Sequence, residues 1–433
     1  MTTRLDWADS NFEDSFGQLV GARRDTLANV DDAVGEILAD VRVRGDEALV
    51  EYTERFDQIT LTPKTLRFAK AEIEQAVVRV EESQLSALHH AAERIEAYHA
   101  KQMPEDVWHT DTDGVGLGAR WTAIDAVGIY VPGGTAAYPS SVLMNAIPAR
   151  VAGVRRVAMA IPTPGGTLNP LVLAAADIAG VTEIYRIGGA QAIATLAHGT
   201  RSIAAVDKIV GPGNAYVASA KRQVFGVVGI DMIAGPSEIL VVADSVNDPA
   251  WIAADLLSQA EHDEAAQAIL MTEDAGFADS VVTQIELLLA ELPRADTARA
   301  SWQRHGAVIV LRSLDQAPPL IDRLAPEHVE LMVAEPQALA DRIHNAGALF
   351  LGRFTPEAIG DYVAGPNHVL PTVRSARYAS GLSVLDFVKR TSLIACNEGS
   401  LATIGPTAIS LAEAEGLDAH ALSVAVRLKN RTT

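Results

Sequence analysis

Residues 127–132, VGIYVP, begin a series of short β-branched runs that decides the fold. The series continues with RRVAMAIP at 155–162, EIYRIGG at 183–189 and DKIVGPG at 207–213. Amphipathic segments such as 141–153, 168–179 and 191–198 lie between the runs. Short apolar strands that alternate with helices are typical of a parallel sheet covered by helices on its faces.

A second series of the same kind follows. Its runs are EILVVAD at 238–244, QAILMTE at 267–273, GAVIVL at 306–311, HVELMV at 328–333 and GALFLG at 347–352. We therefore predict an α/β fold with two Rossmann-like domains, each an incomplete, doubly wound parallel sheet, plus small helical N- and C-terminal segments. The similar rhythm of the two series suggests a duplication.

The apolar spacing at 31–56 and 69–99 predicts helices in the first third of the chain. We expect a helical N-terminal arm at 1–25 and a first Rossmann-like domain built from 26–129 and 239–381. The second Rossmann-like domain is expected at 130–238. The C-terminal segment 382–433, with a helix at 418–428, is expected to dock on another subunit.

Composition limits the classes of function. At 433 residues the chain exceeds what one hydrophobic core usually supports. Its 35 basic and 55 acidic residues give a net charge of −20, which argues against nucleic acid or anionic membrane partners and suits a cationic substrate. No apolar run is long enough to span a bilayer, and the acidic N-terminus is unlike a secretory signal, so we expect a cytoplasmic protein.

Glycines cluster where three strands of the first series should end, around Gly133, Gly188 and Gly211. Ligands of open parallel sheets bind at such ends, where glycine lets the backbone approach a phosphate. None of the loops carries a complete GxGxxG fingerprint, and each one alone is also explained as a plain turn. Because three such loops occur in one α/β unit, a nucleotide site and a set of plain turns are equally good interpretations of them.

Polar groups in the second series are candidates for metal and proton chemistry. Gln259 and His262 stand three residues apart on a predicted helix, so both can face one metal ion, although spacing alone favours an exposed polar face. Asp361, His368 and His420 are further candidates downstream. Glu327 and His328 adjoin a predicted strand, and a carboxylate beside an imidazole can supply two proton-transfer groups if both lie in the loop. A polar loop entry is the alternative.

Taken together, segments from most of the chain resemble the histidinol dehydrogenase family and occur in that family's order. They are VGIYVPGGTAAYPSSVLMNAIPA (127–149), GPGNAYVASAK (211–221), DMIAGPSEILVVAD (231–244), LLSQAEHD (256–263), APEHVEL (325–331), GDYVAGPNHVLPT (360–372), GLSVLDFVKRTS (381–392) and EGLDAHALSVAVRL (415–428). The resemblance implies a zinc-dependent, NAD-linked oxidation of L-histidinol through L-histidinaldehyde to L-histidine, the final steps of histidine biosynthesis.

The resemblance also implies a role for each matching residue. Glu327 and His328 would be the acid-base pair, with His328 taking protons in both oxidations and Glu327 activating water for the second. One zinc ion per subunit would be bound by Gln259, His262, Asp361 and His420, the last from the partner subunit of a homodimer with shared active sites. Tyr130, Gln191 and Asn214 would contact NAD. The substrate would be held by Ser237, His368 and Glu415 together with the zinc ligands and the acid-base pair.

Two alternatives stay open. A paralogous enzyme could use the same scaffold, zinc and NAD to oxidise another small alcohol. A non-catalytic nucleotide-binding protein could keep the fold alone. The single cysteine, Cys396, excludes an intramolecular disulfide and a cysteine zinc cluster, and we expect it to be a buried structural residue rather than a catalytic thiol.

Overall fold

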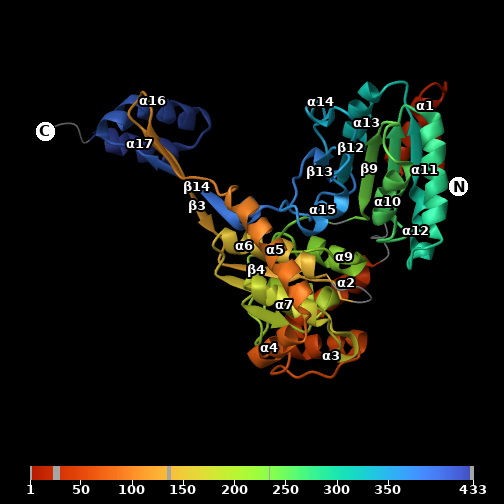
Figure 1. Cartoon of the computed structure of the whole chain (residues 1–433). Coiled ribbons are helices and arrows are strands. Elements are labelled where there is room, and N and C mark those ends of the chain that lie inside the picture. The colour runs from red at the N-terminus through yellow and green to blue at the C-terminus, as the bar shows by residue number, and fades with distance from the viewer. Residues whose placement is uncertain (1, 23–29, 134–137, 234, 430–433) are drawn as a thin grey trace.

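A computed structural model describes residues 2–22, 30–133, 138–233 and 235–429, and Figure 1 shows two α/β units and an extended arm. One unit is built on a parallel sheet of six strands. In order across the sheet these are β1 (Thr3–Asp6), β11 (Ala307–Val310), β10 (Gln267–Thr272), β9 (Glu238–Ala243), β12 (His328–Met332) and β13 (Ala348–Leu351).

Helices cover both faces of this sheet because its central strands are apolar on both faces. Side chains alternate along β9, so Ile239 and Val241 pack on one face while Leu240 and Val242 pack on the other. On the first face lie α10 (Pro249–Ala260), α11 (Ala275–Leu289) and α12 (Ala295–His305). On the second lie α1 (Phe12–Gly21), α13 (Ala317–Leu324) and α14 (Pro336–Ala340). The short helix α15 (Glu357–Tyr362) follows β13.

The second unit is built on a parallel sheet of five strands. In order across the sheet these are β6 (Glu183–Tyr185), β5 (Arg156–Ala160), β4 (Ala126–Tyr130), β7 (Lys208–Val210) and β8 (Gly229–Ile230). If the strands from β4 and from β9 onward are each numbered along the chain, both sheets have the order 3-2-1-4-5, which is the Rossmann order without its sixth strand. The predicted pair of incomplete, doubly wound domains is therefore confirmed, whereas their duplication stays a prediction.

The helices predicted at 31–56 and 69–99 pack on the five-stranded sheet, not on the six-stranded one with which residues 26–129 were grouped. The faces of this sheet are covered by α4 (Lys70–Val78), α5 (Glu82–Ala100), α6 (Pro139–Val151) and α7 (Pro170–Ala179), and by α2 (Asp31–Arg44), α3 (Asp46–Asp57), α8 (Gly189–His198) and α9 (Ala215–Val224). Gly45, at φ +59°, divides the predicted helix 31–56 into α2 and α3. That grouping was wrong because an amphipathic helix shows that it packs on a sheet but not on which one.

The N-terminal segment is also not purely helical. Strand β1 pairs with β11 and adds a sixth strand to the sheet, and Leu5 lies in the core behind it. The sequence TRLD is too short and too polar for a periodicity of two to show it. Residues 1, 23–29, 134–137, 234 and 430–433 are outside the described residues, and 134–137 belong to the predicted glycine-containing loop around Gly133.

The arm is an antiparallel sheet of β2 (Val107–Thr110), β3 (Gly116–Ala123) and β14 (Val388–Ala395), and it carries α16 (Glu398–Ala414) and α17 (Asp418–Lys429) at its end. Figure 1 shows α16 and α17 well away from both α/β units. Helix α17 matches the prediction, whereas α16 and the β-arm were not anticipated. Cys396, expected to be buried, is exposed at the junction between β14 and α16.

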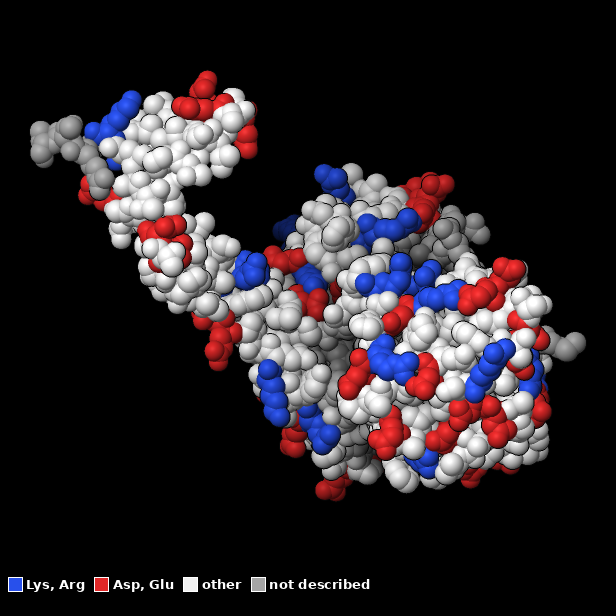
Figure 2. Space-filling view, turned by 90° about the horizontal axis from the view of Figure 1, so that it is seen from above, with Lys and Arg blue, Asp and Glu red and all other residues white. Residues whose placement is uncertain are grey.

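The surface carries charges of both signs. On the face shown in Figure 2, acidic and basic side chains lie among one another over the α/β units. Within the described residues, every helix is too short or too polar to cross a bilayer.

Candidate active site

The predicted acid-base pair lies where the neighbouring strands β9 and β12 of the six-stranded sheet begin. His328 is the first residue of β12 and pairs in register with Ile239 of β9, so Glu238 lies beside Glu327. Both Glu327 and His328 are buried. The site is thus at the amino edge of this sheet, opposite to the edge at which open α/β sheets usually bind ligands.

Main-chain groups of Glu238 fix both side chains. The Glu238 N–H donates to Glu327 Oε2 at 2.9 Å, and His328 Nδ1 lies 2.9 Å from the Glu238 carbonyl oxygen. A carbonyl oxygen only accepts, so Nδ1 carries the proton and donates it. The neutral His328 ring therefore keeps its lone pair on Nε2, which is buried and has no hydrogen-bond partner among the described residues.

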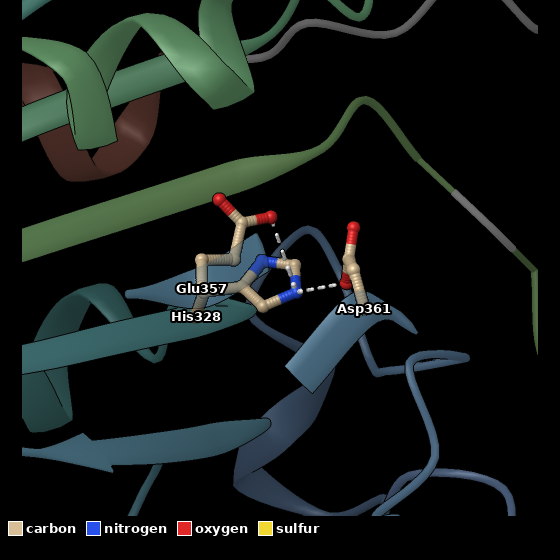
Figure 3. A group of neighbouring side chains, drawn as sticks. All are labelled: His328, Glu357 and Asp361. Atoms are coloured by element: carbon tan, nitrogen blue, oxygen red, sulfur yellow. Dashed lines mark ion pairs between the residues drawn. The ribbon is translucent and has the colours of Figure 1, made fainter. Parts of the chain in front are cut away.

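That lone pair faces carboxylates from α15. His328 Nε2 lies 3.7 Å from Glu357 Oε1 and 3.9 Å from Asp361 Oδ1 (Figure 3). Burial lowers the pKa of His328 to about 4, and the nearby Asp361 charge opposes that shift. His328 is thus a neutral base at pH 7, and a proton taken up at Nε2 would be stabilised by two carboxylates.

The acidic groups behind His328 were not found from the sequence. Glu357 Oε2 accepts from Ser258 Oγ at 3.1 Å, and the Glu357 N–H donates to Glu330 Oε1 at 2.6 Å. Burial raises the pKa of Glu327, Glu330 and Glu357 well above the usual value, and it raises that of Asp255 to about 6. Glu330 in the middle of the otherwise apolar run HVELMV was the only sequence signal, because a charged residue in a fully buried strand requires a polar partner.

Two of the predicted zinc ligands lie together at the end of α10. Gln259 Nε2 is 3.4 Å from His262 Nδ1, and Gln259 Oε1 is buried without a hydrogen-bond partner in the described part of the chain. An unpartnered amide oxygen beside an imidazole is a donor pair that suits zinc. Asp361, His328 and Glu357 form a second group whose ligand atoms lie within 4.8 Å of one another. The predicted set and this group share Asp361.

His368 and Ser237 adjoin the same region. His368 Nδ1 donates to the Asp361 carbonyl oxygen at 3.0 Å, and its Nε2 lies 3.5 Å from Ser141 Oγ. Ser237 directly precedes Glu238 and β9. His420, in α17, and Glu415, at its preceding turn, are exposed at the end of the arm and do not join the site of their own chain (Figure 1).

The predicted NAD contacts gather at the carboxyl edge of the five-stranded sheet. Tyr130 ends β4, and its hydroxyl accepts a hydrogen bond from the Gly189 N–H at 3.1 Å; burial raises the pKa of Tyr130 to about 12. Both polar side-chain atoms of Gln191 are buried without hydrogen-bond partners among the described residues. Asn214 caps α9 by accepting from the backbone of Tyr216 and Val217.

The glycines of this edge leave no room for side chains. A Cβ on Gly188 would overlap Pro162, and one on Gly211, at φ +108°, would overlap the Tyr130 carbonyl group. Helices α8 and α9 begin directly after these loops, so their N-termini point towards the same edge. Close backbone, helix N-termini and unpartnered amides are what a dinucleotide site requires.

Comparison with known proteins identifies the family. The family model described as histidinol dehydrogenase matches residues 21–428. A histidinol dehydrogenase of Rhodospirillum rubrum is 61% identical over 99% of both chains, and one of Rhizobium meliloti is 60% identical over 99% of both. The crystal structure of histidinol dehydrogenase from Elizabethkingia anophelis superposes with a TM-score of 0.94 at 37% identity, covering 99% of this chain and 98% of that one. The chain therefore belongs to the histidinol dehydrogenase family.

Proposed function

We propose that Glu327 and His328 perform the proton transfers when this chain carries out the family's reaction, the zinc- and NAD-dependent oxidation of L-histidinol to L-histidine. The orientation of His328 is the observation that supports this most strongly. Its Nδ1–H is committed to the Glu238 carbonyl group, so the free lone pair on Nε2 points into the site. A base must present a free lone pair to the proton that it takes.

NAD, when bound by the residues at the carboxyl edge of the five-stranded sheet, would supply the hydride acceptor for both oxidations. His328 Nε2 takes the hydroxyl proton of L-histidinol in the first step and that of the aldehyde hydrate in the second. The carboxylates of Glu357 and Asp361, 3.7 and 3.9 Å away, would stabilise the resulting imidazolium. Glu327 would accept the proton of the water that hydrates the aldehyde, and a cation brought next to it lowers its raised pKa for that task.

We assign zinc to Gln259, His262 and Asp361, completed by the partner subunit's His420. Bound there, zinc would act as a Lewis acid that orients the amino and imidazole groups of the substrate. Ligation through His328 Nε2 is the alternative, but it would occupy the lone pair with which His328 takes protons. The proposed homodimer follows from this assignment, because α17 lies too far from α15 in its own chain. Ser237, His368 and the partner subunit's Glu415 would then hold the substrate.

The zinc content of variants distinguishes the proposed ligand set from the alternative set that contains His328 and Glu357. His262→Asn should lower bound zinc from about one ion per subunit to near zero, whereas His328→Asn and Glu357→Gln should retain the ion and lose turnover. Elemental analysis of dialysed protein measures this. Loss of zinc in His328→Asn with retention in His262→Asn would overturn the assignment.

Turnover tests the reaction, and mixed dimers test the sharing of sites. Zinc-loaded protein should form two NADH per L-histidinol and none after chelation; no activity on L-histidinol but activity on another small alcohol would favour the paralogous enzyme. Glu327→Ala and His420→Ala subunits, each inactive alone, should regain partial activity in verified heterodimers, since one of the two sites then lacks neither residue. Heterodimers without activity would contradict shared sites.

A further inference from the structure

Buried polar groups without partners concentrate at one place outside the catalytic site. Asp57 Oδ2, Thr163 Oγ1 and both polar atoms of the Gln191 side chain are buried, and none has a hydrogen-bond partner among the described residues. The three residues are at least nine-tenths buried, with exposed fractions of 7%, 1% and 1%. Buried polar groups left unpaired destabilise a fold, so a cluster of them indicates a ligand that supplies the partners.

The cluster lies at the carboxyl edge of the five-stranded sheet. Thr163 follows the end of β5, and its N–H donates to the carboxylate of Asp57, the last residue of α3. Gln191 lies in the first turn of α8, next to Gly189, whose N–H bonds to the Tyr130 hydroxyl. The charge of Asp57 also reaches Tyr130 and adds to its raised pKa. Asp57 and Thr163 therefore extend the proposed NAD site.

The position of Asp57 in the topology gives it a specific meaning. Strand β5 is the second strand of a Rossmann order that starts at β4. In dinucleotide-binding folds of this order, an Asp or Glu following the second strand accepts hydrogen bonds from the ribose 2′-hydroxyl of NAD. Here the residues after β5 are Ile161, Pro162 and Thr163, none of them acidic. The carboxylate of Asp57 reaches this place from another element, α3.

We propose that Asp57, assisted by the Thr163 hydroxyl, binds the adenosine ribose of NAD and makes this chain select NAD over NADP. The carboxylate and the hydroxyl can accept from the two ribose hydroxyls. The 2′-phosphate of NADP would bring negative charge against a buried carboxylate, which costs affinity. Figure 1 places α3 on the side of the five-stranded unit turned away from α15, as expected if the adenosine end lies far from the reacting end. The proposal rests on the proposed location of the NAD site.

Calorimetric titration of the zinc-loaded protein with NAD and with NADP tests the proposal without relying on turnover. Asp57→Asn should weaken NAD binding about 10- to 100-fold, because a hydrogen bond to a charged acceptor is lost, and should reduce the preference for NAD over NADP at least about tenfold. Thr163→Val should weaken NAD binding about three- to tenfold with the preference unchanged. The KM for L-histidinol should stay within about twofold in both variants, since neither residue touches that site.

Glu54→Gln is the matched control, because it removes one negative charge from the exposed face of the same helix. It should change neither affinity. Thermal unfolding without cofactor should show Asp57→Asn and Thr163→Val at least as stable as the parent chain, since Asp57→Asn removes a buried charge and Thr163→Val removes an unpaired buried hydroxyl.

NAD affinities within twofold of the parent in both variants would overturn the proposal. So would parallel losses for NAD and NADP together with a lower melting temperature, which would show a structural role. These results are independent of the reaction: a parent chain that binds NAD but does not oxidise L-histidinol would refute the proposed function and leave the role of Asp57 intact.

Discussion

The buried ion pair between Lys221 and Asp231 should be the most sensitive point of the five-stranded unit for stability. The Lys221 and Asp231 side chains are 3% and 1% exposed, and both form hydrogen bonds with the backbone of Gly211. Lys221 Nζ donates to the Gly211 carbonyl oxygen at 2.9 Å, while Asp231 Oδ2 accepts from the Gly211 N–H at 2.8 Å. Lys221→Met would leave the Asp231 carboxylate buried without its counter-charge.

The loss from breaking a buried pair on one side is about 3–5 kcal/mol, against about 0–1 kcal/mol for an exposed pair. We therefore expect Lys221→Met to lower the free energy of unfolding by about 3–5 kcal/mol. The double variant Lys221→Met/Asp231→Asn should recover at least about half of this loss, because the buried charge is gone while the amide oxygen still accepts from the backbone. Urea unfolding of the five-stranded unit, followed by circular dichroism, measures both.

The matched control is Arg299→Met, which breaks the exposed pair with Glu286 and should cost at most about 1 kcal/mol. NAD affinity should fall in Lys221→Met as well, since Asn214 lies in the loop that Gly211 begins. A cost below about 1 kcal/mol for Lys221→Met, or a double variant as unstable as the single one, would refute this reasoning.

Three further predictions concern the catalytic unit. Glu327→Gln keeps an acceptor for the Glu238 N–H, so the variant should fold normally. Stopped-flow traces of NADH should show the aldehyde step slowed about 10²- to 10⁴-fold and the alcohol step within about threefold of the parent. Equal losses in both steps would contradict the separate roles of Glu327 and His328. The pKa of Asp255, about 6, is raised above its ordinary value of 3.8 by burial, so the folded state binds the extra proton and stability should fall as pH rises from about 4 to 6. Burial also raises the pKa of Glu330, so Glu330→Gln removes a second carboxyl that contributes to this decline and should make it shallower by about 1–3 kcal/mol in urea unfolding at pH 4.5 and 7; an unchanged slope would count against it. Chelation should abolish NADH formation yet leave the NAD dissociation constant within about twofold, because zinc and NAD are proposed at different sheets; calorimetry would show a large change if that is wrong.

The sequence predicted the sheets better than it predicted which helices pack on each. The two series of apolar runs predicted the four strands β4 to β7 and the five strands β9 to β13, except for their exact ends, because buried parallel strands are apolar on both faces. The packing of α2 to α5 could not be predicted, since helical periodicity carries no information about the partner. The arm was missed because β2 is exposed, β3 is mostly half-buried and both are partly polar, so neither forms an apolar run.

The candidate active site likewise has features that the sequence revealed and features that only the structure shows. Glu327 and His328 were recognised through family resemblance, and only the structure shows that Glu238 fixes both through its main chain. Contacts of this kind leave no trace in residue identity. Asp57 was missed for a related reason: it lies over 70 residues before Tyr130, and α3 brings its carboxylate to a strand end that lacks an acid.

The exposed position of Cys396 gives the protein a natural reporter. It is the single thiol of the chain and lies between β14 and α16, and Figure 1 shows α16 well away from β12. A maleimide dye or nitroxide would therefore label one defined point in each chain, and no other cysteine would have to be removed by mutation first. Distances between two such labels, measured by pulsed electron resonance, would report directly how the arms of two chains are placed in the proposed homodimer.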